Sequence, residues 1–66
     1  MEVKLWQFLG LMRECEFIDV YVNDERVFHG QVFEYEVMDC EAEAIVRDFE
    51  VKTESSNVSI VKINCR

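Results

Sequence analysis

The chain has 66 residues, half of them apolar, with 14 acidic and seven basic side chains and a formal net charge of −7. So short a chain supplies one hydrophobic core, so we expect a single domain over residues 1–66 and exclude an active site formed between two domains. The apolar content is too high for a disordered acidic tail, and no stretch approaches the roughly 20 apolar residues of a membrane span.

Residues 1–12 are predicted to form an amphipathic helix. Apolar side chains recur there at steps of three and four residues, which places one stripe on a helix face: Met1, Leu5, Phe8, Leu9 and Met12. Val3, Trp6 and Leu11 fall outside this stripe. Because tryptophan is common among interface anchors, these three residues are a candidate apolar binding surface, and one hypothesis is a homodimer through this helix. The alternative is that Trp6 completes a thin core.

The next segments predict a β-hairpin. Every second residue of the segment 17–22 is apolar and β-branched, which is the period of two typical of a strand. Turn-forming side chains follow at 23–25, and residues 26–32 return to a β-rich sequence. Gly30 indicates either a bulge in this second strand or the end of the strand, because a residue without Cβ relieves crowding.

Residues 35–45 fit two periods. The segment begins with strand-like alternation, but Tyr35, Met38, Ala42 and Ile45 recur at helical steps. Glu-Ala-Glu-Ala at 41–44 consists of good helix formers, so we expect a helix in the later part of this segment.

The last third of the chain predicts a second hairpin. Residues 45–53 alternate again, residues 54–57 favour a turn, and residues 58–63 are β-branched. The predicted fold class is therefore α+β, in the order αββαββ. We expect a mainly antiparallel sheet of about four strands with both helices packed on one face. The pattern does not fix the order of the strands.

The segment Val27, Phe28, His29 and Gly30 stands between an acidic turn and a short acidic helix. In this pattern, and in the aromatic-x-Gly step at Phe28 and Gly30, the chain resembles small uncharacterised α+β proteins of Firmicutes and their phages. The resemblance covers nearly the whole chain. It implies a host or phage accessory protein and transfers no functional residue.

Catalytic and metal chemistry find little support in the sequence. His29 is the single histidine and lies in no nucleophile motif, so we expect no enzymatic activity. Cys15, Cys40 and Cys65 lie 25 residues apart, whereas zinc sites use closely spaced pairs. We therefore expect no metal and no cofactor. The cysteines are predicted to be reduced and to act as small buried apolar side chains in a cytoplasmic protein.

Negative charge is concentrated in residues 34–50, which hold one basic residue, Arg47, and seven acidic ones. The acidic residues are Glu34, Glu36, Asp39, Glu41, Glu43, Asp48 and Glu50. Such a segment repels nucleic acid and anionic membranes and attracts a basic partner. We therefore predict a non-enzymatic protein that binds a protein with a basic surface through these residues. The extreme form is a nucleic-acid mimic, as in anti-restriction and anti-CRISPR inhibitors.

Two alternatives remain. The glutamates can be the solvated face of a short helix and an edge strand, which keeps a small protein in solution. The chain can also be a structural or homo-oligomeric accessory protein that uses its apolar N-terminal helix.

Overall fold

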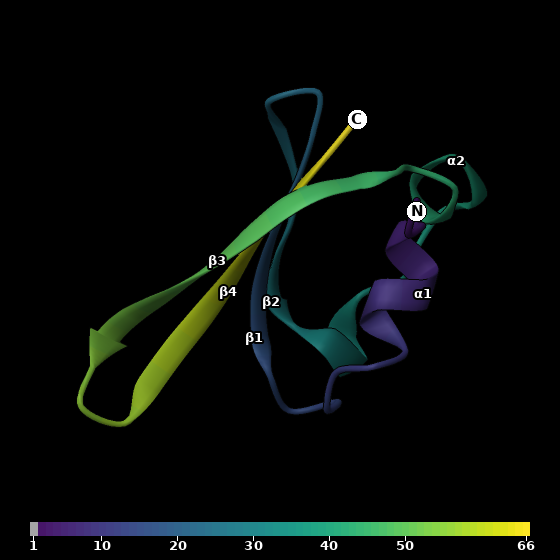
Figure 1. The fold of residues 1–66 in the computed structure, drawn as a ribbon. Helices are drawn as coiled ribbons and strands as arrows, with labels where there is room; N and C mark the ends of the chain where they lie inside the picture. The colour runs from purple at the N-terminus through teal and green to yellow at the C-terminus, as the bar shows by residue number, and fades with distance from the viewer. Residues whose placement is uncertain (1) are drawn as a thin grey trace.

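The computed structural model describes residues 2–66, which form a four-stranded mixed sheet with two short helices (Figure 1). The elements are α1 (Leu5–Leu9), β1 (Phe17–Val22), β2 (Glu25–Gln31), the 3₁₀ turn η1 (Val32–Glu34), α2 (Asp39–Ala42), β3 (Val46–Ser55) and β4 (Val58–Cys65). The strand order is β2-β1-β4-β3. The predicted α+β class is confirmed.

The centre of the sheet is the parallel pair β1 and β4, and antiparallel partners flank it on both sides. Val20 lies opposite Ile63 in this pair, and the neighbouring strands extend the row to Phe28 and Phe49. Directly opposed residues share a face, so this row contributes to the side of the sheet that packs against α1. The buried core consists of Leu5, Leu9, Ile18, Val20, Ala44, Ile63 and Cys65.

Helix α1 is shorter than the predicted helix over residues 1–12. The backbone of Val3 and Lys4 pairs with the start of β3, since Val46 N–H donates to the Val3 carbonyl and Lys4 forms a bridge with Ile45. Gly10 caps the other end. Within these limits the predicted apolar stripe is confirmed, because Leu5 and Leu9 are buried and Phe8 and Met12 pack against the core. Met1, also part of that stripe, lies outside the described residues.

The helix predicted in the later part of residues 35–45 is confirmed as α2, which begins at Asp39, so Tyr35 and Met38 lie before it. Tyr35 leaves η1 with an extended backbone and stacks on Phe28 of β2, with ring centroids 4.3 Å apart. This contact holds the chain away from a helical path until Met38, which is 63% exposed instead of lying on a core-facing stripe. Helix α2 retains only four residues, Asp39–Ala42.

Both hairpins have two-residue turns, but they differ in exposure. Asn23 and Asp24 join β1 to β2 with φ values of 52° and 67°, a conformation that Asn and Asp tolerate well.

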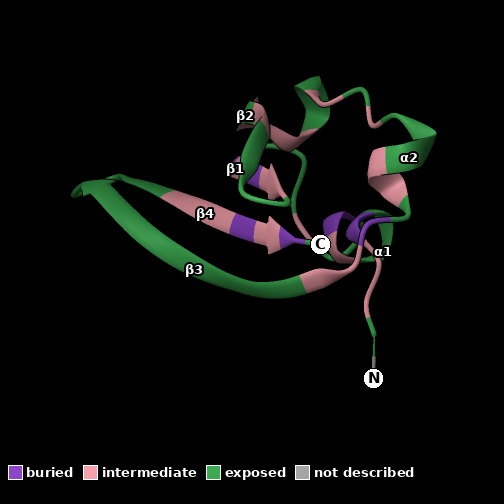
Figure 2. Cartoon of the chain, turned by 90° about the horizontal axis from the view of Figure 1, so that it is seen from above, coloured by how far each residue is buried: buried purple, intermediate pink, exposed green. Residues whose placement is uncertain are grey.

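Strand β3 is two residues longer than the predicted 45–53 at its C-terminal end, and β4 also continues past the predicted 58–63 to Cys65. Every β3 residue after Val46 is exposed (Figure 2). The β3–β4 hairpin is therefore an arm that extends beyond the packed part of the sheet.

Gly30 lies at the end of its strand, as one of the two sequence alternatives predicted. Strand β2 ends at Gln31, whereas the bulge in this hairpin falls at Val27, where Val20 pairs with Phe28 and Tyr21 pairs with Arg26. The extra residue rotates Arg26 to the side of the sheet that faces away from α1.

The cysteines only partly follow the prediction of buried apolar side chains. Cys65 is buried, and this burial raises the pKa of its thiol. Cys15 and Cys40 are exposed, so the prediction is wrong for those two. They lie before β1 and in α2, on segments outside the central pair of strands.

Gly30→Ala is expected to lower the free energy of unfolding by about 1–3 kcal/mol. A Cβ there would lie 3.1 Å from Cζ of Phe28, and its φ of 153° disfavours any side chain. Gly10→Ala is the control, because Gly10 has φ −65° and only ordinary contacts; it should leave stability unchanged or raise it by up to about 1 kcal/mol. Urea denaturation measures both, and equal stability of the two variants would contradict the prediction.

Candidate functional site

The structure divides the predicted acidic segment between two sides of the sheet. Asp48 and Glu50 alternate with Phe49 in β3, and since Phe49 packs on the α1 side, the two carboxylates point away from it. The other five acidic residues lie in the connection between β2 and β3: Glu34, Glu36, Asp39, Glu41 and Glu43. The seven predicted site residues are therefore not one surface.

We call residues 32–43, which contain η1 and α2, the acidic loop; it has five acidic residues and no basic one. Two of its carboxylates are engaged within the fold. Glu41 accepts a 2.9 Å hydrogen bond from Tyr35 Oη, and Glu43 lies 2.6 Å from Nζ of Lys4. Glu34, Glu36 and Asp39 are exposed and form no ion pair with any residue of the described range 2–66. Three carboxylates thus remain available to a partner.

Large apolar side chains are exposed among these carboxylates. Phe33 and Met38 are each 63% exposed. An exposed phenyl ring and thioether do not help to keep a protein in solution. Aromatic and methionine side chains are, in contrast, enriched in protein interfaces. The charge pattern of the sequence did not reveal these two residues, because the same apolar spacing also fits a strand or a helix face.

The acidic loop is tied to the body of the protein at its start and its middle. Val32 and Phe33 N–H groups donate to the carbonyls of Glu16 and Glu14, and Tyr35 stacks on Phe28. Burial and the hydrogen bond to Glu41 raise the pKa of Tyr35 well above its usual range. The exposed side chains of the loop are therefore presented on a backbone that is held in place.

Asp48 and Glu50 lie among cations and amides on the open side of the sheet, the side away from α1. Asn64 donates a 2.6 Å hydrogen bond to Asp48, and Lys52 Nζ lies 3.8 Å from Glu50. Lys62, opposite Glu50 in the register, lies beside it. Lys52 thus offsets the charge of Glu50, whereas Asp48 is bonded to a neutral amide; both carboxylates lie on the opposite side of the sheet from the acidic loop.

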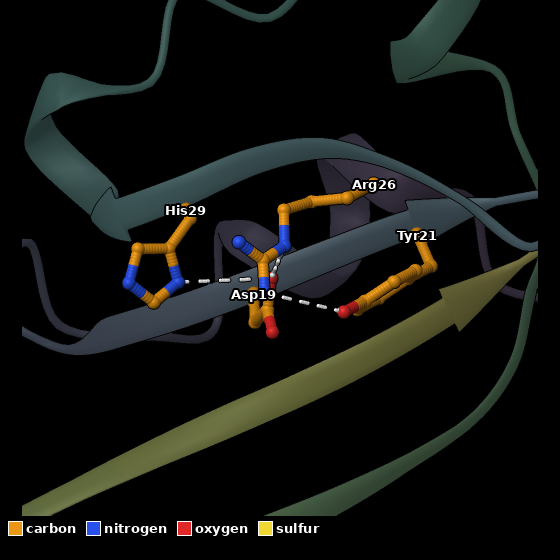
Figure 3. A network of polar contacts seen from close by, with 4 residues as sticks. All are labelled: Asp19, Tyr21, Arg26 and His29. Carbon is orange, nitrogen blue, oxygen red and sulfur yellow. Dashed lines mark hydrogen bonds and ion pairs between the residues drawn. The ribbon is translucent and has the colours of Figure 1, made fainter.

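A polar network occupies the centre of the open side (Figure 3). Arg26 Nε lies 3.0 Å and His29 Nδ1 3.7 Å from Asp19 Oδ1, and Arg26 Nη2 donates to the Tyr21 hydroxyl at 3.4 Å. The Tyr21 bond and the charge of Asp19 raise the pKa of Arg26. Lys62 Nζ lies 4.9 Å from the Tyr21 ring centroid, within cation–π range.

The members of this network bond to one another within the fold. The network contains His29 beside a carboxylate but no thiol or aliphatic hydroxyl that the imidazole could activate. Within residues 2–66, no three histidine, cysteine or acidic side chains are gathered closely enough to hold a metal ion. These contacts link Arg26 and His29 of β2 to Asp19 and Tyr21 of β1.

The candidate apolar surface of the N-terminal helix is also divided. Trp6 and Leu11 are 51% and 85% exposed, whereas Val3 is half-buried because its backbone pairs with β3. Trp6 thus does not complete the core, and two of the three predicted residues are accessible.

A shallow pocket of about 280 Å³ lies where the two ends of the chain meet β3. It is lined by Glu2, Ile45, Val46, Arg47 and Arg66. Its carboxylate and one of its guanidinium groups already form an ion pair at 3.2 Å, between Glu2 and Arg66. The sequence could not indicate this pocket, since its lining comes from segments far apart in the chain.

No family model, curated protein or solved structure matches the chain. In the described part of the chain, no helix has the length and apolar character needed to cross a membrane.

Tyr35→Phe is expected to lower the free energy of unfolding by about 1 kcal/mol at neutral pH, because it removes the hydrogen bond to Glu41. The fold favours the neutral phenol, so folded Tyr35 keeps its proton at pH values where the unfolded residue, with a pKa near 10, loses it. The contribution of Tyr35 is thus complete below about pH 10 and is lost as the pH rises further. Denaturation at several alkaline pH values should show a shallower decline in the variant; equally steep declines would contradict the assignment.

Proposed function

We propose that this protein has no catalytic role and binds a protein partner with a basic surface through the acidic loop. The observation that carries the proposal is the composition of that loop on the folded molecule. Five acidic residues stand there without a basic one, and Phe33 and Met38 are exposed between them. This combination favours a binding surface over a purely solvated one.

The two kinds of side chain have different tasks in such a contact. The unpaired carboxylates of Glu34, Glu36 and Asp39 accelerate encounter with a basic surface and disfavour nucleic acid and anionic membranes. Phe33 and Met38 supply apolar area, which contributes roughly 25 cal/mol for each Å² removed from water. Lysine and arginine stems and guanidinium groups pack well on such side chains.

The proposal narrows the surface that the sequence suggested. Asp48 and Glu50 are outside it, because they point to the other side of the sheet and lie beside Asn64 and Lys52. Partners that themselves bind nucleic acid are one class with the required basic surface, and inhibition of such a partner is the extreme form of the function. Exposed, unpaired thiols at Cys15 and Cys40 favour a reducing, cytoplasmic setting.

The test is affinity capture of cytoplasmic proteins by the immobilised protein at about 0.05 M and about 0.5 M salt. The double variant Glu34→Lys/Glu36→Lys should lose most of the basic proteins that the wild type retains at low salt. Phe33→Ser/Met38→Ser should lower retention at both salt concentrations, because it removes the salt-insensitive apolar part of the contact.

Glu25→Lys/Glu54→Lys is the matched control. It reverses two exposed charges outside the acidic loop and changes the net charge by the same amount. If both charge-reversal variants lose the captured proteins equally, the net charge and not the loop is responsible, and the proposal is wrong.

A second candidate function is a homo-oligomeric accessory protein that uses α1. The exposure of Trp6 and Leu11 favours it, because large apolar side chains in water are typical of contact surfaces. Trp6→Glu should then lower the mass measured in solution, and an unchanged mass would remove this candidate.

A further inference from the structure

Strand β3 has an outer edge that is largely unpaired. It is the last strand in the order β2-β1-β4-β3, and only its start is covered, where Val46 bonds to Val3 and Lys4 bridges Ile45. Beyond that point, no residue in the described range pairs with its outer side. Figure 2 shows β3 as an exposed rim of the molecule. Unpaired N–H and C=O groups on such an edge can pair with another strand.

The free edge is regular over residues 48–53. Register shifts with β4 lie on either side, between Val46 and Asp48 and between Thr53 and Ser55. Bulges of this kind end the regular pairing geometry of a strand. Any added strand therefore has five or six residues to pair with.

Apolar side chains are exposed along this same stretch. Phe49 and Val51 are 55% and 60% exposed, although they project from the side of the sheet that carries α1. Phe49 touches Phe8 of α1, with ring centroids 5.2 Å apart, and Val51 is one step farther along the arm. The helix thus covers the beginning of this apolar row and leaves the rest in water.

We propose that a second copy of this chain occupies the edge, with the two β3 strands antiparallel and a two-fold axis at Val51. In an antiparallel pair, directly opposed residues share a face. A two-fold axis through such a pair of identical residues therefore leaves the α1 sides of both copies on the same side of the combined sheet. Val51 then meets Val51, and Phe49 meets Thr53 of the second copy. On the open side, Glu50 meets Lys52 of the second copy, and symmetry repeats this ion pair. Asp48 comes opposite Glu54, which lies at the bulge outside the regular stretch 48–53.

The neighbouring registers are less favourable. A two-fold at Glu50 forms two Asp48–Lys52 pairs but places Glu50 against Glu50 between them, and a two-fold at Lys52 places Lys52 against Lys52 and Glu50 against Glu54. A two-fold at Phe49 places Asp48 against Glu50 twice. Like charges directly opposite destabilise a strand pair, whereas opposite charges stabilise it. The strand is therefore self-complementary in the Val51 register, which favours a second copy over an unrelated partner.

The dimer joins the two sheets into one sheet of eight strands and covers Val51 and part of Phe49 in both copies. The acidic loop lies outside this contact, so the inference does not depend on the proposed function. Its failure would leave that proposal untouched.

Sedimentation equilibrium of the full chain from about 1 µM to about 1 mM tests the inference. The wild type should approach twice its 7.9 kDa mass as the concentration rises. Glu50→Lys and Lys52→Glu should each weaken dimerisation by about tenfold or more, because each creates two like-charge contacts. The exchange Glu50→Lys/Lys52→Glu recreates both ion pairs in the Val51 register and should restore the affinity to within about threefold of wild type.

The exchange also controls for folding. The single variant Glu50→Lys and the double variant both place a lysine at position 50 opposite Lys62 of β4. A folding defect caused by this contact would therefore persist in the double variant. Val51→Lys should abolish the dimer, while Glu25→Lys, a matched reversal on β2, should not weaken it. A wild-type monomer at about 1 mM, a failure of the exchange to restore dimerisation, or a dimer broken by Trp6→Glu and not by Val51→Lys would each overturn the proposal.

Discussion

The parallel pairing of β1 and β4 is the constraint on which the rest of this structure depends. It joins a strand near the beginning of the chain to one at its end, and Ile18, Val20 and Ile63 become fully buried there. Each such side chain contributes about 1.5–3 kcal/mol by leaving water. Because parallel neighbours cannot be joined by a tight turn, the whole segment between them must leave the centre of the sheet and return.

The position of every candidate surface follows from this return path. The chain leaves β2 through the acidic loop, crosses on the side that carries α1, and re-enters the sheet as the edge strand β3. The loop is tied down by the stack of Tyr35 on Phe28 and by its bonds to residues before β1. Within the described residues, β3 pairs along its length with β4 alone, and only its start is covered on the other side, so its outer edge faces water over most of its length.

The small core, seven buried side chains within residues 2–66, also explains why apolar groups remain exposed. A domain of this size buries a smaller fraction of its surface than a larger one, and α1 has only five residues with which to cover the sheet. The uncovered apolar side chains fall in different electrostatic settings. Phe33 and Met38 lie among unpaired carboxylates, which suits a basic partner, whereas Val51 lies between Glu50 and Lys52, which suits a second copy of the strand.

The sequence by itself determined the local elements that short-range periodicity encodes: the strand pairs, the turn at Asn23 and Asp24, and the face of α1 that carries Leu5 and Leu9. These depend on neighbours within a few residues. The extent of α1 and the extended path at Tyr35 were decided by partners far along the chain, Ile45 and Phe28.

The candidate site shows the same division. Local composition located the five carboxylates of the acidic loop, but the alternation of β3 turned Asp48 and Glu50 to the other side of the sheet. The exposure of Phe33 and Met38, and the free edge around Val51, became visible only in the folded molecule. Composition counts charges and apolar groups along the chain, whereas a surface depends on which side chains the tertiary fold covers, and that is a property of contacts between distant segments.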